Sequence, residues 1–453
     1  MTTPPVTSSG GPGTILDLAV DSLATGGEGV ARDASGRVVF LPRTAPGDRV
    51  RAKVTASRKR WARAEVVELL EAGPARRTPP CPVYDLCGGC ALQHLEIQAQ
   101  RNGKRRIVKE TLRRIGGIEI DLPEVAHAGN ELEYRNRVTL TLRRNVDGVR
   151  FGFRNRLDPG EVVDVHDCPL AEAAVRRGLT ELRGCWGVTA SNLPEGRELK
   201  VTIRSAVDGG VAVHVVGGIE GAHGRPDVIA TSLNGLLSYV HTDSAGHRTV
   251  LAGSSSFPDR WQGTRFELGP GTFLQVNRTV SAIMDRQLDE FVGTRRRTVI
   301  ADLYSGVGAR ALRWAREGAR VNAVEADLEA VAAGRAAAAA EGLDVEFFGA
   351  RVESVPESYS EAEIIVVNPP RAGLSEQVSE RIAASSVARG LAYVSCDPAT
   401  LARDLRLLAS RWVPTAVRAF DAFPQTSHVE TMVWLEPADR SSKRSERSAA
   451  ERT

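Results

Sequence analysis

Apolar and polar residues alternate along residues 14 to 72, and turn residues separate the alternating runs. Alternation with a period of two is typical of strands that bury one face. Several short strands in about sixty residues predict a small barrel of the OB type, a frequent platform for nucleic acids. The expected strands are Thr14–Ala19, Gly26–Ala31, Arg37–Leu41, Arg49–Val54 and Trp61–Leu70.

A loop that contains proline and cysteine follows Gly73, and a basic helix is expected from Gln98 to Ile115. From residue 132 the pattern returns to strands, which predicts an antiparallel α+β middle domain. Its expected strands are Arg137–Leu142, Val149–Phe153, Glu161–Val165, Leu199–Ile203, Gly210–Val216 and His247–Leu251, and its expected helices are Leu170–Arg183 and Pro226–Ser238.

Strands alternate with helices in the last part of the chain, which predicts an α/β, Rossmann-like domain with a parallel, doubly wound sheet. Its expected strands are Val299–Tyr304, Arg320–Glu325, Ile364–Val367 and Gly390–Ser395, and its expected helices are Ala309–Glu317, Leu328–Glu341 and Thr400–Leu408. The predicted organisation is a disordered N-terminus (1–13), the barrel (14–72), a cysteine loop with the basic helix (73–131), the middle domain (132–262), the Rossmann-like domain (263–438) and a disordered tail (439–453).

Charge is distributed unevenly along the chain, although the net charge is only +3. Residues 43 to 77 hold ten basic residues against four acidic ones, and a second basic cluster runs from Arg101 to Arg114. Two solvated faces would explain this, but two such runs in one third of the chain favour a polyanionic partner. Trp61, set among basic residues, could stack on a base or belong to the core.

Nothing in the sequence indicates a signal peptide or a membrane span, so we expect a cytoplasmic protein. In the cytosol, thiols stay reduced, and the six cysteines are better explained as metal ligands or nucleophiles than as disulfides. Nothing suggests an obligate interface, and a monomer is expected.

A glycine-containing turn follows the strand Val299–Tyr304, with Gly306 and Gly308 at the start of the next helix. Such a turn lets the backbone approach a nucleotide-like ligand closely. Glu325, at the end of the following strand, stands where carboxylates hold ribose hydroxyls. These features leave a dinucleotide and S-adenosylmethionine (SAM) as alternatives.

Three further segments indicate the chemistry: Asn368-Pro-Pro-Arg371, Ser395-Cys396-Asp397-Pro398 and the segment from Asp421 to Glu430. Loops at the carboxyl ends of parallel strands surround the ligand crevice, so the first two should converge on the glycine turn. Carbon 5 of uracil attacks a methyl sulfonium only after a thiolate has added to carbon 6, and a base must then remove the carbon-5 proton. Cys396 suits the first role and Glu430 the second.

These motifs, with Phe273-Leu-Gln275-Val-Asn277 and Tyr304, resemble those of the uridine carbon-5 RNA methyltransferases, the RumA/TrmA-like family. The resemblance extends from the N-terminal barrel to Trp434. The barrel itself looks like a TRAM domain. The resemblance implies Cys396 as nucleophile, Glu430 as proton-abstracting base, and Gln275, Tyr304 and Glu325 as SAM contacts. Gly306 and Gly308 of the glycine turn and Asn368 complete the expected SAM site. The family usually has Asp where this chain has Asn368. Asn-Pro-Pro also occurs in amino-group methyltransferases, but these need no cysteine nucleophile.

Cys81, Cys87, Cys90 and Cys168 form a four-thiol set, and their spacing suits zinc or an iron–sulfur cluster. The resemblance implies a [4Fe–4S] cluster, with zinc as the alternative. Cys185 is interpreted as structural. The barrel and cluster together resemble enzymes that act on 23S rRNA, so we expect 5-methyluridine formation in rRNA. Transfer RNA is the alternative substrate, and an RNA-binding iron–sulfur protein with an inactive methyltransferase domain is the non-enzymatic alternative.

Overall fold

The computed structural model describes residues 11–293 and 296–439. Its N-terminal part is a closed barrel with strand order β1-β2-β3-β5-β4. Alternate residues of β1, among them Leu16, Leu18 and Val20, point into the barrel, which confirms the period-two prediction. The strands are β1 (Ile15–Leu23), β2 (Gly29–Arg32), β3 (Val38–Leu41), β4 (Arg49–Ser57) and β5 (Trp61–Glu71).

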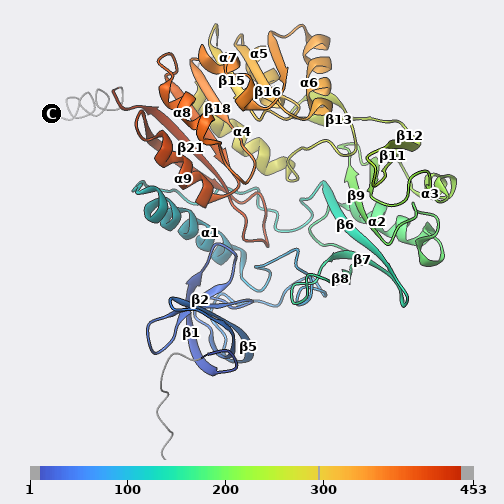
Figure 1. Cartoon of the computed structure of the whole chain (residues 1–453), viewed down its shortest axis with the longest axis vertical. Helices are drawn as coiled ribbons and strands as arrows, with labels where there is room; N and C mark the ends of the chain where they lie inside the picture. The colour runs from blue at the N-terminus through green and yellow to red at the C-terminus, as the bar shows by residue number, and fades with distance from the viewer. Residues whose placement is uncertain (1–10, 294–295, 440–453) are drawn as a thin grey trace, which may run out of the picture.

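The basic helix α1 (Ile97–Thr111) runs between the barrel and the C-terminal sheet (Figure 1). A turn of π-helix, Leu112–Gly116, extends it to the end that the sequence predicted. Val108 and Leu112 pack into the core under helix α9 (Pro398–Leu408). Lys104 is fully buried, so this helix does not simply present its charges to solvent.

The middle domain is a seven-stranded sheet, ordered β12-β11-β10-β9-β6-β7-β8, and its helices pack into the same core. The elements are β6 (Arg137–Asn145), β7 (Gly148–Arg154), β8 (Val162–Asp164), α2 (Ala173–Cys185), a 3₁₀ turn (Val188–Ala190), β9 (Glu198–Ser205), β10 (Val211–Val216), α3 (Pro226–Ser232), β11 (Leu236–Thr242) and β12 (Arg248–Gly253).

Two predictions for this domain were wrong in detail. The helix expected over Pro226–Ser238 ends at Ser232, because Gly235 turns the chain at a φ of +71° and Leu236–Thr242 forms β11. This strand pairs with β10 in parallel, so the sheet is mixed and not wholly antiparallel. The crossover through α3 makes the parallel pairing possible.

The C-terminal sheet has the order β17-β16-β15-β18-β19-β21-β20. Strand β21 runs antiparallel to both of its neighbours, β19 and β20. Apolar clusters on its two faces join it to the helices, as expected for a doubly wound fold. The elements are α4 (Arg278–Val292), β15 (Val299–Leu303), α5 (Ala309–Arg316), β16 (Arg320–Glu325), α6 (Leu328–Glu341), β17 (Val345–Gly349), a 3₁₀ turn (Val352–Ser354), α7 (Glu357–Ser360), β18 (Ile364–Val367), α8 (Glu376–Ala384), β19 (Gly390–Ser395), α9, β20 (Trp412–Phe420) and β21 (Glu430–Pro437).

A hairpin of β13 (Phe257–Trp261) and β14 (Thr264–Leu268) links the middle and C-terminal sheets. Phe257, Trp261 and Phe266 pack with the C-terminal core, so the hairpin spans the predicted limit at 262. The limits of all the predicted domains remain predictions. The disorder expected for 1–13 and 439–453 falls almost entirely on residues 1–10 and 440–453, outside the described residues.

Candidate active site and cysteine site

A cavity of about 1280 Å³ opens at the carboxyl ends of the parallel strands. This is the edge at which open α/β sheets bind ligands, because the strand-to-helix loops meet there. Seven of the eight predicted catalytic and SAM-site residues line it: Gln275, Tyr304, Gly306, Glu325, Asn368, Cys396 and Glu430. The eighth, Gly308, does not line the cavity, although its neighbours Val307 and Ala309 do. Segments separated by more than a hundred residues in the sequence thus face one space.

The glycine turn is held in a conformation that opens it toward the cavity. Tyr304, Gly306 and Gly308 have φ angles of +62°, +58° and +71°, in the left-handed region. Gly308 caps the N-terminus of α5, and a Cβ there would lie 2.6 Å from the Phe347 ring. Only glycine therefore fits at position 308.

Glu325 braces this turn at the end of β16. Its Oε2 accepts the Gly306 backbone N–H at 2.9 Å, and its Oε1 accepts those of Ala326 and Asp327 at 2.7 and 2.9 Å. The carboxylate thus fixes the glycine turn and also lines the cavity, where it can accept hydroxyl hydrogens from a ligand.

Gln275 and Asn368 enter the cavity from two other elements. Gln275 lies just before α4, and its backbone carbonyl oxygen accepts a hydrogen bond from the side-chain amide of Asn136 at 3.0 Å. Asn368 follows β18, and its backbone N–H donates to Leu303 O at 3.2 Å. An amide at position 368 offers both a donor and an acceptor, without the charge of a carboxylate.

The register of two neighbouring strands brings Cys396 and Glu430 together. Strands β19 and β21 are antiparallel, and Ser395 pairs with Thr431. The next residues along the two strands are Cys396 and Glu430. Asp397 then begins α9, where its Oδ1 accepts the N–H groups of Ala399 and Thr400 at 2.8 and 3.0 Å. This N-cap fixes the point at which the chain turns away behind Cys396.

Burial and charge set the acidities of this pair. Glu430 is 3 % exposed, and its burial raises the pKa of its carboxyl to about 7, against the opposing effect of Arg310 and Arg371. Burial also raises the pKa of the half-buried Cys396 thiol, and the nearby Glu430 adds to the rise while Arg371 reduces it. A carboxyl that titrates near neutrality is suited to moving a proton.

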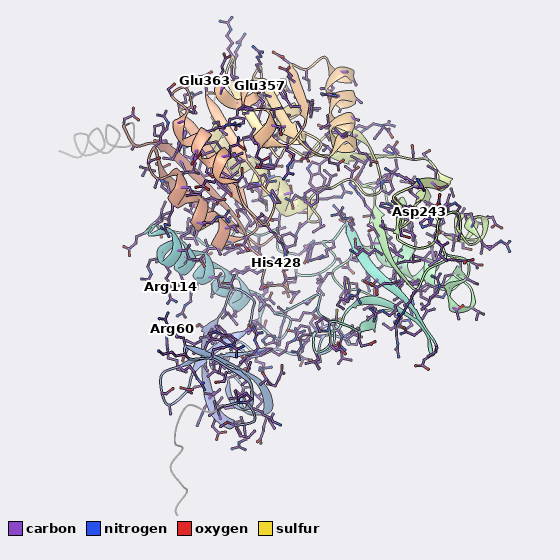
Figure 2. The ribbon with its side chains drawn as sticks, viewed as in Figure 1. Arg60, Arg114, Asp243, Glu357, Glu363 and His428 are labelled. Atoms are coloured by element: carbon purple, nitrogen blue, oxygen red, sulfur yellow. The ribbon has the colours of Figure 1, made fainter. Side chains whose placement is uncertain are left out.

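Several charged or polar cavity residues were not assigned from the sequence, among them Arg371, His428, Arg310 and Asp302. Arg371 approaches His428, with 3.2 Å between Nη2 and Nε2, and Figure 2 shows His428 near the centre of the molecule. Arg310 donates to the buried Asp285 at 2.6 Å. Asp302 Oδ2 is buried with no hydrogen-bond partner among the described residues, and burial raises its pKa to about 7. Arg371 and His428 lie inside motif segments that the sequence singled out, which was the available signal.

The four predicted ligand cysteines, Cys81, Cys87, Cys90 and Cys168, line a second cavity of about 80 Å³. No three of their sulfur atoms lie within 4.8 Å of one another, in the part of the chain that the structure describes. Sulfur atoms around one tetrahedral zinc would be about 3.8 Å apart, given Zn–S distances of about 2.3 Å. The thiols are therefore spaced more widely than a single zinc ion requires.

Burial sets the acidities of the cysteines that line this second cavity. Burial raises the pKa of the Cys87 thiol to about 11 and that of Cys90 to about 12, and neighbouring thiols add to both rises. A bound metal centre would reverse this, because thiolates are its ligands. Cys185 lies elsewhere, with its Sγ 3.5 Å from Leu182 O.

Comparison with known proteins identifies the family. The chain is 34% identical to the 23S rRNA (uracil(1939)-C(5))-methyltransferase RlmD of Chromohalobacter salexigens, over 92% of this chain and 88% of that protein. The chain belongs to the uracil-C5 RNA methyltransferase family. The RlmD of Halomonas elongata is also 34% identical to this methyltransferase, over 93% of this chain and 90% of that protein.

Family models and a solved structure agree with this assignment. Residues 346–438 of the methyltransferase match the tRNA (Uracil-5-)-methyltransferase family, residues 12–67 the TRAM domain and residues 281–391 the methyltransferase small domain. The tRNA (uracil-54, C5)-methyltransferase of Pyrococcus abyssi, solved with S-adenosyl-L-homocysteine, is 25% identical with a TM-score of 0.72, covering 93% of this chain and 100% of that one. The predicted TRAM barrel and the predicted fold of a SAM-dependent methyltransferase are thus confirmed.

Within residues 11–293 and 296–439, the methyltransferase has no helix that is both long and apolar enough to cross a membrane.

Proposed function

We propose that this methyltransferase forms 5-methyluridine in 23S rRNA, with Cys396 as nucleophile and Glu430 as base. The observation that carries the proposal is the placement of these two side chains at neighbouring positions of β19 and β21, in the cavity that also holds the glycine turn. SAM supplies the methyl group. Its side of the cavity is lined by Gln275, Tyr304, Gly306, Glu325 and Asn368, and Gly308 shapes the glycine turn as the N-cap of α5.

The reaction then uses the residues in order. The Cys396 thiolate adds to carbon 6 of the uracil, and the ring electrons move toward the carbon-4 oxygen. Carbon 5 then attacks the methyl group of SAM, the bond from that methyl to the sulfonium breaks, and S-adenosyl-L-homocysteine is released. The Glu430 carboxylate removes the carbon-5 proton, the carbon 5–carbon 6 double bond re-forms, and the thiolate leaves. Arg371 opposes the rise in the pKa of the Cys396 thiol, so it favours the thiolate both when the sulfur adds to carbon 6 and when it leaves.

The relatives of this chain support 23S rRNA as the substrate. Two curated relatives that match most of this chain act on 23S rRNA, whereas the structurally similar archaeal enzyme acts on tRNA. The target uridine must leave its stack to reach a cavity at a sheet edge, so the RNA has to present it unpaired. The barrel and α1 supply basic residues for the RNA backbone.

The test is transfer of labelled methyl from SAM to rRNA and tRNA that lack 5-methyluridine, followed by mapping of the modified position. Transfer to 23S rRNA alone supports the proposal. Transfer to tRNA alone would favour the alternative substrate. With purified protein that retains its metal centre, no transfer to either RNA would favour the non-enzymatic alternative, an RNA-binding protein with an inactive methyltransferase domain.

We expect release of the RNA to depend on pH through Glu430. Only the carboxylate accepts the carbon-5 proton, and its pKa is raised to about 7. The rate of adduct breakdown should therefore rise between about pH 6 and pH 8 and level off above. Rapid-quench measurement of adduct decay after a pH jump checks this. A decay rate that stays constant across this range would contradict the assignment of Glu430.

We also propose that Cys81, Cys87, Cys90 and Cys168 hold a [4Fe–4S] cluster. The 80 Å³ cavity and the wide spacing of the sulfur atoms favour a polynuclear group over one zinc ion. The cluster would tie residues 81–90 to Cys168 of the middle domain.

Replacing Cys87 with serine should remove most of the iron and acid-labile sulfide from the purified protein, because one of four thiolates is lost. Metal analysis measures this. The matched control is Cys185→Ser, which should keep full metal content because Cys185 lies outside the cavity. Stoichiometric zinc without sulfide in the unaltered protein would instead identify a zinc site.

A further inference from the structure

The segment from Asp421 to Glu430 carries His428 and Glu430 and is held by distant parts of the chain. Lys104 Nζ on α1 donates to Asp421 Oδ1 at 2.5 Å and to Phe423 O at 2.9 Å, and the Lys104 and Asp421 side chains are fully buried. The Tyr134 hydroxyl donates to Pro424 O at 3.0 Å. The segment is thus fixed at its start from α1 and from the chain that enters the middle sheet.

Gln425 makes the densest contacts in this segment. It is fully buried, and its φ of +70° reverses the chain direction between Pro424 and Thr426. Its backbone N–H donates to Gln100 Oε1 at 2.9 Å, and Gln100 Nε2 donates back to Gln425 Oε1 at 2.9 Å. This reciprocal amide pair joins α1 directly to the segment.

Two more side chains complete the surroundings of the Gln425 amide. Arg77 Nη2 donates to Gln425 Oε1 at 3.1 Å, and Gln425 Nε2 donates to Glu131 Oε2 at 3.2 Å. Arg77 and Glu131 also form an ion pair at 2.7 Å. The side chain is therefore enclosed by fixed partners, and buried polar groups with all partners present favour one conformation.

The backbone of Gln425 connects the segment to the cysteine loop. Its carbonyl oxygen accepts the N–H groups of Ala91 and Leu92 at 3.0 and 2.9 Å. Ala91 directly follows Cys90. These two bonds involve no side-chain atom of Gln425, so they persist when its side chain is changed.

A tight turn leads from Gln425 toward the active site. Thr426 Oγ1 donates to Phe423 O at 2.8 Å, and the His428 backbone N–H donates to Thr426 Oγ1 at 3.3 Å. Glu430, the first residue of β21, follows two residues later. The position of the Gln425 side chain therefore fixes the turn from which the Glu430 strand begins.

We propose that Gln425 is a positioning residue for Glu430: through its amide pair with Gln100, it holds the turn 423–428 so that the Glu430 carboxyl faces the target base beside Cys396. This inference rests on the proposed function, in which Glu430 removes the carbon-5 proton. It assigns a role to a side chain that touches neither the RNA base nor SAM and that does not line the cavity.

The test separates formation of the covalent RNA–protein adduct from its release. Gln425→Gly removes the side chain, keeps the carbonyl that accepts Ala91 and Leu92, and tolerates a positive φ. Adduct formation should stay within about threefold of the unaltered enzyme, because Cys396 lies on another strand. Adduct release should slow by roughly 10- to 100-fold, the cost of a base displaced by about 1 Å. Denaturing gels of labelled 23S rRNA fragment, sampled over time, measure both rates.

Gln100→Ala should reproduce the accumulation of adduct, since it removes both bonds of the pair, whereas Gln425→Gly removes the bond to the side chain and keeps the one from the backbone N–H. The double variant should be no slower in release than the slower single variant, because the two side chains act through one contact. Gln425→Asn retains an amide and tolerates a positive φ, so release should recover in part. The matched control is Asn192→Ala, which removes a side-chain hydrogen bond to Cys185 O in the middle domain and should accumulate no adduct.

Two results would overturn the inference alone: release at the normal rate in folded Gln425→Gly and Gln100→Ala enzymes, or equal losses of formation and release, which would mark a purely structural role. If the unaltered enzyme forms no adduct through Cys396, the proposed function fails and this inference fails with it.

Discussion

Cys396→Ala should abolish both methyl transfer and the covalent RNA adduct, lowering the rate by about 10⁴-fold or more. Without the thiolate, carbon 5 of uracil remains a poor nucleophile, and no other residue of the cavity replaces the sulfur. RNA and SAM should still bind, because the glycine turn and Glu325 are untouched. Labelled-methyl transfer and denaturing gels measure the two losses, and binding titrations measure the remaining affinity.

The control is Cys185→Ala, which removes a partly buried thiol outside the cavity and should keep activity near normal. If Cys396→Ala still forms an adduct that survives denaturation, another residue is the nucleophile. If it forms no adduct but transfers methyl at the normal rate, the reaction does not pass through a covalent intermediate.

Glu430→Gln should have a different effect: one methyl group is transferred, and the RNA then stays attached to Cys396. The amide fills the same space but cannot accept the carbon-5 proton, so elimination should slow by about 10²- to 10⁴-fold. The adduct should therefore accumulate to nearly one per enzyme, while multiple-turnover activity is lost. Mass spectrometry of the trapped species distinguishes a methylated adduct from an unmethylated one.

Glu172→Gln is the matched control for this prediction. Burial also raises the pKa of Glu172, but its carboxylate accepts a hydrogen bond from Ser205 outside the cavity. This variant should release RNA normally. An unmethylated trapped adduct in Glu430→Gln would place the role of Glu430 before methyl transfer, and normal turnover would exclude it as the base.

Much of the fold could be predicted from the periodicity of apolar residues, and the failures have physical causes. The alternating strands of the barrel bury one face each, so their pattern is clear. Leu236–Thr242 interrupts its apolar residues with Ser238 and His241, so it shows no period of two, and its first residues were assigned to the helix expected from Pro226. The hairpin Phe257–Leu268 and helix α4 were not predicted from the sequence.

The candidate site was predicted as a set of residues, but its electrostatics were not. Cys396 and Glu430 could be chosen by chemistry, while their adjacency depends on the antiparallel register of β21. Arg310 reads in the sequence as an ordinary basic residue in the first turn of a helix. Only the packing of α4 against α5 buries it beside Asp285. Asn368 lines the cavity as expected, and its effect on SAM affinity stays a prediction.

The buried ion pair of Lys104 with Asp421 limits how far this enzyme can be treated as separable modules. Asp421 belongs to the methyltransferase sheet, but its cationic partners Lys104 and Arg101 lie on α1, more than three hundred residues earlier in the chain. A fragment that began at the Rossmann-like domain would lose both of these cations, and it would expose the apolar surface under α9 that Val108 and Leu112 cover. Evolution by exchange of RNA-binding modules would therefore have to keep α1 with the catalytic sheet.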